Sequence, residues 1–100
     1  MEAELLKVLG HPARLQVLQI LARQETCVCE LLPVLGLEQS NLSQHLKLLR
    51  KHGIVQARRD GSRVIYQIAN PAVLPILAAA RQAVQAHLDG MAALAVRRQA

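Results

Sequence analysis

Aromatic side chains are nearly absent from this chain, which has no Phe, no Trp and one Tyr, Tyr66. Proteins that bind single-stranded nucleic acid or RNA loops stack the bases on aromatic rings, so the composition argues against that class of partner. The core must be built from Leu, Val, Ile and Ala instead, and 52% of the residues are hydrophobic. A length of 100 residues predicts one domain over residues 1–100.

Signals for catalysis, secretion and membrane insertion are also missing. The chain has no phosphate-binding glycine loop, and its acidic residues and histidines lack the spacing of a catalytic pair, so we expect neither an enzyme nor an organic cofactor. Residues 1–10 include Glu2 and Glu4 and lack the apolar core of a signal peptide. Residues 73–96 are too polar to cross a bilayer. Two cysteines one residue apart do not make a disulfide framework, so we expect a cytoplasmic protein without a membrane partner.

Charged residues are few, but the basic ones are concentrated in one stretch. Residues 47–63 hold six basic residues and one acid, and so account for the whole formal net charge of +5. A local basic patch is typical of a phosphate-binding surface, whereas evenly spread charges would only keep the protein in solution. The clustering therefore favours nucleic acid as the partner.

The middle of the chain predicts two helices joined by a short turn. The first is expected over residues 26–35, with Thr26 as its N-cap and Gly36 as its stop, and Pro33 should shorten or bend it. The second is expected over residues 38–52, with a stripe of leucines on its inner face. Two helices separated by a short glycine-containing turn are a helix-turn-helix signature.

A β-hairpin is expected directly after the second of these helices. Residues 54–59 and 63–69 alternate as strands do, and Asp60-Gly61 between them is a strong hairpin signal. The hairpin would project as a wing with three arginines near its tip. We therefore predict a mainly α winged helix-turn-helix fold, with five helices and a two-stranded β-hairpin wing.

The outer face of the helix over residues 38–52 carries short amide, hydroxyl and imidazole side chains and no acid after its first residue. Asn and Gln pair with adenine in the major groove and Ser bonds either base, while Lys and Arg hold phosphates. An ordinary solvent-facing helix would carry Glu beside Lys, so the pattern favours DNA. The residues expected to contact DNA from this helix and the wing are Gln39, Ser40, Asn41, Ser43, Gln44, His45, Lys47, Arg58, Arg59 and Arg63.

Helices are also expected near the two ends of the chain, over about residues 2–9 and 72–96, and Pro12 suits the first turn of a fifth helix whose leucines follow at helical spacing. The helix over about residues 72–96 has an apolar seam that is too long for a monomer that already has its core. It could fold back on its own domain, but an exposed stripe of this length favours association with a second copy. We expect a homodimer whose interface includes Leu5, Leu9, Leu77, Val84, Leu88 and Met91.

Cys27 and Cys29 lie at the start of the helix expected over residues 26–35. On a regular helix, residues two apart point about 200° away from each other, so both thiolates reach one ion only if the first turn unwinds. A helix N-terminus favours the thiolate form, and thiolates prefer soft ions. An equally good interpretation of the pair is two small buried hydrophobic side chains on either side of Val28.

The chain resembles the arsenic-repressor (ArsR/SmtB) family of bacterial winged-helix regulators over nearly its whole length. The resemblance rests on LGHPARLQVLQIL at 9–21, TCVCELL at 26–32, SNLSQHLKLLRKHGIV at 40–55 and RRDGSRVIYQI at 58–68. It implies a homodimer that binds double-stranded operator DNA and blocks transcription. It also implies that trivalent arsenic, antimony or another soft thiophilic ion releases the DNA by binding at Cys27 and Cys29.

Two departures from the family pattern narrow this expectation. Leu32 stands where arsenic-sensing members often have a third cysteine, so a two-thiol site would suit a monosubstituted organoarsenical. The last helix offers only His87 and Asp89 in place of the zinc sensors' ligands, so we expect no zinc site there. Two alternatives remain: a thiol-oxidation or persulfide sensor, which would have to close a disulfide between residues two apart in a helix, and a winged-helix module that binds another protein.

Overall fold

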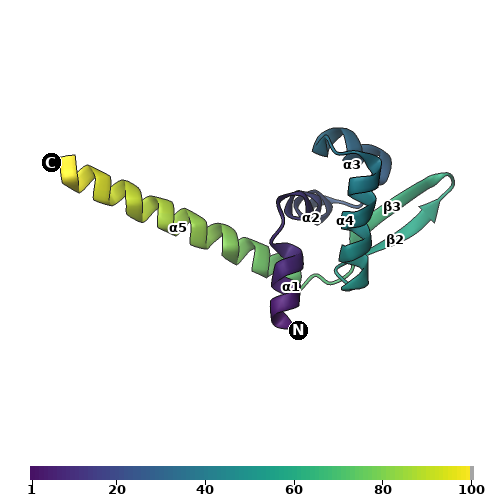
Figure 1. The fold of residues 1–100 in the computed structure, drawn as a ribbon, viewed down its shortest axis with the longest axis horizontal. Coiled ribbons are helices and arrows are strands. Elements are labelled where there is room, and N and C mark those ends of the chain that lie inside the picture. The colour runs from purple at the N-terminus through teal and green to yellow at the C-terminus, as the bar shows by residue number, and fades with distance from the viewer. Residues whose placement is uncertain (100) are drawn as a thin grey trace.

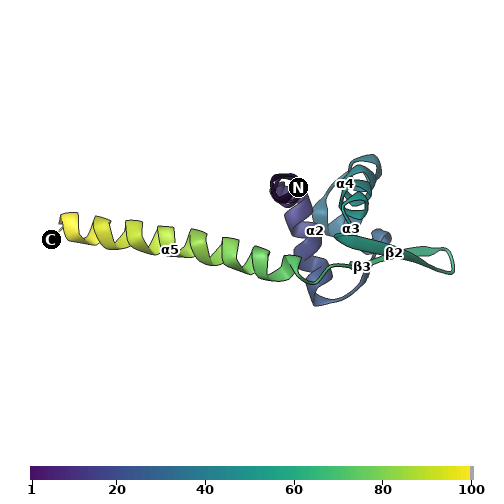
Figure 2. The same cartoon turned by 90° about the horizontal axis from the view of Figure 1, so that it is seen from below.

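The structure is a computed structural model, and it describes residues 1–99 of the chain. The elements in chain order are α1 (Glu2–Leu9), α2 (Pro12–Arg23), β1 (Thr26–Cys27), α3 (Val28–Leu35), α4 (Gln39–Lys51), β2 (Val55–Asp60), β3 (Arg63–Ile68) and α5 (Val73–Gln99). Figure 1 shows α1 to α4 forming a helical body, with the β2–β3 wing projecting from one side and α5 from the other. The same separation is visible after a 90° turn (Figure 2). The predicted winged helix-turn-helix fold with five helices is confirmed.

Local signals explain where the helices begin and end. Pro12 occupies the first turn of α2, where a missing N–H costs nothing, and His11 caps that helix. Gly36 ends α3 in the left-handed conformation with φ 65°, which glycine adopts without steric strain. Pro33 lies inside α3, which ends after 8 residues. Pro75 lies in the first turn of α5, where a backbone N–H would have no partner within the helix, so its missing N–H costs nothing.

The sheet has three strands, in the order β1-β3-β2, whereas a two-stranded wing was expected. Thr26 and Cys27 are extended and pair antiparallel with Tyr66 and Ile65 of β3. Thr26 is therefore not the N-cap of α3. Cys27 takes that position, and α3 begins at Val28 rather than two residues earlier.

The core lies between α2, α3, α4 and the base of the sheet. Leucines at helical spacing on α4 supply much of it, because positions separated by three or four residues lie on one face. Its most completely buried side chains are Val17, Leu18, Leu31, Leu42, Leu46, Leu49, Ile54 and Val73. Each buried Leu or Ile contributes about 1.5–3 kcal/mol relative to exposure. Leu9 also belongs to this core at 3% exposure and so has little surface left for the dimer contact expected of it.

Helix α5 packs against the core through residues near its start. Val73 is buried and Leu77 is half-buried, but every residue from 78 to 98 is exposed. Val84, Leu88 and Met91 are 59%, 51% and 54% exposed, although they share one helix face. Within residues 1–99, no helix has the length and apolarity that a membrane span requires.

Candidate nucleic-acid interface

Most of the polar residues expected to read DNA lie on the exposed face of α4. Helix α4 buries its leucines against the core, and this orients the opposite side of the helix toward solvent. The exposed residues of the expected set on α4 are Gln39, Ser40, Asn41, Ser43, Gln44 and Lys47. The helix thus presents a continuous polar surface that contains no acidic side chain.

His45 does not lie on this exposed face, contrary to the sequence-based expectation. It follows Leu42 by three residues and precedes Leu49 by four, so it lies at the flank of the buried stripe and is half-buried. Its ring stands 4.5 Å from the ring of His11, and its Nδ1 lies 3.2 Å from the guanidinium of Arg14. His45 therefore connects α4 to α2, and a contact between His45 and DNA stays a prediction.

Burial, and then the charges of His11 and Arg14, lower the pKa of His45 from its usual 6.5. Because an arginine can only donate, Nδ1 of His45 is the acceptor, and the neutral ring carries its proton on Nε2. Arg14 also donates from Nε to the backbone carbonyl of Val8 at 2.6 Å. Arg14, which the sequence analysis missed, thus joins α1, α2 and the proposed reading helix.

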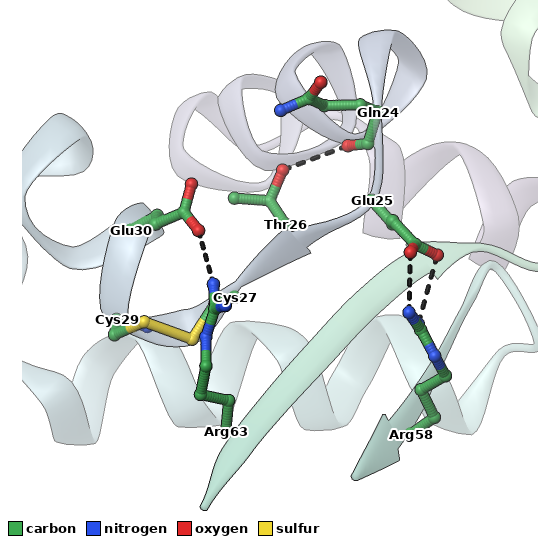
Figure 3. A network of polar contacts seen from close by, with 8 residues as sticks. All are labelled: Gln24, Glu25, Thr26, Cys27, Cys29, Glu30, Arg58 and Arg63. Carbon is green, nitrogen blue, oxygen red and sulfur yellow. Dashed lines mark hydrogen bonds and ion pairs between the residues drawn. A yellow bond between two sulfur atoms is a disulfide. The ribbon is translucent and has the colours of Figure 1, made fainter. Parts of the chain in front are cut away.

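Two of the three wing arginines are held in ion pairs. Arg58 donates two hydrogen bonds to Glu25, at 2.6 and 3.1 Å, and Arg63 donates one to Glu30 at 2.7 Å (Figure 3). All four side chains are about half exposed, so these pairs contribute little to stability. Contact of Arg58 and Arg63 with DNA would require them to leave these carboxylates, whereas Arg59 is exposed and has no ion pair within residues 1–99.

The two cysteines meet at the start of α3. Cys27 has extended backbone angles, φ −70° and ψ 146°, because it still belongs to β1, whereas Cys29 lies in the first turn of the helix. Their Cα atoms are 5.2 Å apart and their sulfur atoms form a disulfide (Figure 3). The two sulfurs meet because Cys27 precedes the helix and only Cys29 is helical, whereas the sequence-based expectation placed both residues inside the helix.

The cysteine pair and the basic side chains of α4 line one groove, which we call the α4–wing groove. It has a volume of about 1070 Å³ and lies between α3, α4 and β3. Its cationic lining residues are Lys47, Arg50, Lys51 and Arg63, and none of the described residues that line it is acidic. Arg50 and Lys51 were missing from the expected contact set, although both belong to the basic stretch over residues 47–63.

Cys27 and Cys29 differ in their access to this groove. Cys27 is only 3% exposed, and its Sγ accepts a hydrogen bond from the backbone N–H of Cys29 at 3.1 Å. Cys29 itself is exposed. Within residues 1–99, no cluster of three His, Cys, Asp or Glu side chains is arranged to hold a metal ion. Once reduced, the pair thus offers two sulfur ligands without a third protein ligand among the described residues.

Comparison with known proteins places this geometry in a family. Residues 11–57 match the family model described as "Bacterial regulatory protein, arsR family". The chain belongs to the ArsR family. The uncharacterized HTH-type transcriptional regulator Rv0081 of Mycobacterium tuberculosis is 49% identical over 83 residues, which cover 82% of this chain and 73% of that protein. The crystal structure of Rv0081 superposes with a TM-score of 0.83 over 90% of this chain and 91% of that chain, at 46% identity.

Two further relatives inform the function of this ArsR-family chain. The homodimeric winged helix-turn-helix domain Mb0332 of Mycobacterium bovis has a TM-score of 0.78 and 33% identity, covering 88% of this chain and 82% of that one. The arsenical resistance operon repressor of Staphylococcus xylosus is 39% identical over 64 residues, which cover 64% of this chain and 62% of that protein. The chain is a transcriptional regulator of the ArsR/SmtB family and not an enzyme.

Proposed function

We propose that the protein is a homodimeric repressor that binds double-stranded operator DNA and leaves it when a trivalent arsenic or antimony compound binds Cys27 and Cys29. The observation that carries this proposal is the position of the cysteine pair on the wall of the α4–wing groove, opposite free cations of α4. When the pair is reduced, two thiolates are close enough to bind one soft atom. This fits a monosubstituted arsenical, which needs two sulfur ligands, and a relative is named an arsenical resistance operon repressor.

A direct structural path links the thiols to the wing. Cys27 pairs with Ile65 of β3, and Glu30, which follows Cys29 in the first turn of α3, holds Arg63 at 2.7 Å. A ligand atom bound between the two sulfurs separates them relative to the arrangement in the structure, and this change in spacing repositions the first turn of α3. That movement shifts Glu30 and, through it, Arg63 and the wing, so DNA contact and thiol chemistry are coupled.

The homodimer is supported by the exposed apolar face of α5. Leu77, Val84, Leu88 and Met91 lie at helical spacing on one side of this helix, which extends away from the body in Figure 1. The related domain of M. bovis is described as homodimeric. We expect Val84→Glu to produce monomers in sedimentation experiments, and Gln82→Glu, which adds the same charge two residues away, to remain dimeric. Wild-type protein that sediments as a monomer at micromolar concentration would contradict the dimer.

The thiol assignment is tested by release of duplex DNA selected for tight binding. Under reducing conditions, arsenite or phenylarsine oxide should release the wild type, whereas zinc should act poorly because the site has no third protein ligand. Cys27→Ser retains an N-cap acceptor for α3, and Cys29→Ser changes an exposed side chain, so both variants should fold and bind DNA. Both should lose arsenical release. Variants that respond like the wild type would overturn the thiol site, and release by zinc alone would place it elsewhere.

A thiol-redox response is the second candidate, because the structure closes the Cys27–Cys29 disulfide. In that case, oxidation of the pair by a low-molecular-weight disulfide would itself change DNA affinity. The measurement is DNA binding by fully reduced and fully oxidised protein, with Cys29→Ser under both conditions as the control. Equal affinity of the two wild-type forms would exclude this role and leave the arsenical as the proposed signal.

A further inference from the structure

The α4–wing groove combines two features that neither DNA binding nor soft-ion binding needs together. Lys47, Arg50 and Lys51 line it from α4, and Cys29 opens into it from α3. Phosphates require only the cations, and a soft ion requires only the sulfur atoms. A ligand that engages both features carries a sulfur atom and negative charge within one small molecule.

We propose that the groove binds an anionic low-molecular-weight thiol, which forms a mixed disulfide with Cys29. This inference rests on the proposed role of Cys27 and Cys29 as the sensing thiols, but it assigns the groove a different ligand and a covalent reaction. The groove volume of about 1070 Å³ accommodates a small organic molecule. Carboxylate or sulfonate groups of that molecule would form charge-assisted hydrogen bonds with the cations of α4.

The reaction is a thiol–disulfide exchange that starts from the Cys27–Cys29 disulfide. The sulfur of the incoming thiolate forms a bond to Sγ of Cys29. The bond between the two protein sulfurs breaks, and its electron pair leaves on Sγ of Cys27. One disulfide replaces another, so no oxidant or reductant is needed besides the thiol itself.

The different surroundings of the two sulfurs determine which one is attacked. Cys29 is exposed to the groove, whereas Cys27 is 3% exposed and is not accessible to a thiolate from solvent. Sγ of Cys27 already accepts a hydrogen bond from the backbone N–H of Cys29 at 3.1 Å, at the N-terminal end of α3, and the departing thiolate would keep this donor. Both the hydrogen bond and the helix dipole stabilise negative charge there. Attack at Cys29 with departure of Cys27 is therefore the favoured direction.

The adduct has a regulatory consequence, because it occupies the surface that the proposed operator contact uses. An anionic group held by Arg50 and Lys51 neutralises the cations that would otherwise hold phosphates. Adduct and duplex DNA therefore compete, and each must weaken the binding of the other by the same factor at equilibrium.

The charge preference of the site is measured most simply on Cys27→Ser, which leaves Cys29 as the only thiol. Two chromogenic disulfides serve as probes, the dianionic dithiobis(nitrobenzoate) and the neutral dithiodipyridine. The ratio of their reaction rates is compared with the ratio for free mercaptoethanol. We expect the protein to favour the anionic probe by about tenfold relative to the free thiol, as electrostatic steering into a cationic groove does, and salt should reduce the preference.

Matched variants locate the preference within the groove. Arg50→Gln with Lys51→Gln should lower the rate ratio markedly toward that of free mercaptoethanol, because two of the four cations that line the groove are removed. Lys7→Gln with Arg23→Gln removes the same charge at exposed positions outside the groove and should preserve the ratio. Duplex DNA should protect Cys29 from both probes. An equal ratio in the protein and in mercaptoethanol, or a preference that loss of Arg50 and Lys51 does not reduce, would overturn the proposal.

The oxidised wild type then tests which sulfur reacts. Treatment with mercaptoethanesulfonate should yield an adduct on Cys29 by peptide mass analysis, and it should form faster per thiolate than the adduct with neutral mercaptoethanol. An adduct on Cys27 would contradict the proposed direction. Failure of arsenicals to release DNA, with the charge preference intact, would count only against the proposed function. Loss of the preference, with arsenical release intact, would count only against the anionic thiol site.

Discussion

The basic residues of α4 and those of the wing carry the same charge, yet they have different partners. Lys47, Arg50 and Lys51 are exposed and form no ion pair within residues 1–99, whereas Arg58 and Arg63 are held by Glu25 and Glu30. A cation without a partner can neutralise a phosphate directly and release the counterion that is condensed on the DNA. A paired arginine must first leave its carboxylate, so its net contribution to DNA affinity is smaller. We therefore expect α4 to supply most of the electrostatic affinity for DNA. We expect the wing to respond to structural changes around the cysteines, because its two paired arginines contact the residues that flank them.

The largest expected effect comes from the cations of α4. Replacing Lys47, Arg50 and Lys51 by Gln should make the negative slope of log K against log salt shallower by about 0.9 per lost phosphate contact. The same change should weaken DNA binding on the order of 100-fold at 0.15 M salt. Arg58→Gln with Arg63→Gln should reduce the slope by less per residue. Equal slope changes per residue would break the comparison. Binding to an acidic protein but not to duplex DNA would contradict the nucleic-acid interface itself.

The second-largest effect concerns the preference for particular DNA sequences, which should depend on α4 and not on the wing. Gln44 lies on the exposed face of α4, so Gln44→Ala should change the ranking of DNA sequences by about 1–3 kcal/mol at the affected base pair. Arg59→Gln in the wing should weaken all sequences by a similar factor, since phosphate contacts carry no sequence information. Competition binding with a randomised duplex library measures both. A uniform loss in Gln44→Ala would remove this residue from base recognition.

A smaller effect, on release of DNA by an arsenical, is expected when the ion pair between the wing and α3 is removed. Glu30→Gln removes the partner of Arg63 beside Cys29, and Glu25→Gln removes the partner of Arg58 farther from the pair. Each change should alter stability by less than about 1 kcal/mol, because both pairs are exposed. Glu30→Gln should raise the arsenical concentration needed for DNA release, whereas Glu25→Gln should leave it close to that of the wild type. Equal shifts in both variants would show that the coupling does not run through Glu30.

The smallest effect concerns the side of α4 that faces away from the groove. The pKa of His45 is lowered from 6.5 in the folded protein, so the unfolded chain binds more protons below that pH. The contribution of His45 to stability is therefore complete above about pH 6.5 and is lost as the pH falls through the lower folded-state pKa. His45→Gln should flatten this decline in urea unfolding, whereas His87→Gln, on exposed α5, should not. An unchanged pH slope in His45→Gln would assign the decline to other groups.

Local sequence signals were sufficient for most helices and for the hairpin. Pro12, Gly36 and the leucine spacing of α4 act within a few residues, so their structural effect can be predicted without the rest of the chain. Asp60-Gly61 likewise places the wing tip, where Gly61 has φ 64°. The inward position of His45 could also have been predicted, because its spacing from the buried leucines was visible in the sequence.

Other features depended on contacts between distant segments. β1 has only two residues and no alternation to reveal it, and it exists because Thr26 and Cys27 pair with β3. The ion pairs of Glu25 with Arg58 and of Glu30 with Arg63 each join residues 33 positions apart. The assembly of Cys29, Arg50 and Lys51 around one groove follows from packing of α3, α4 and the wing. These features could not be predicted, because no local pattern specifies which distant side chains become neighbours.

The sequence by itself determined the helix-turn-helix, the basic surface of α4, the apolar seam of α5 and the presence of two thiols. Each of these depends on residue type and on spacing along a single element, where the helical or strand repeat sets the geometry. Only the tertiary structure decided that Cys27 is extended while Cys29 is helical, so that their sulfurs meet. The same packing paired two wing arginines and left the cations of α4 free, because carboxylates from around β1 reach β2 and β3 but not α4.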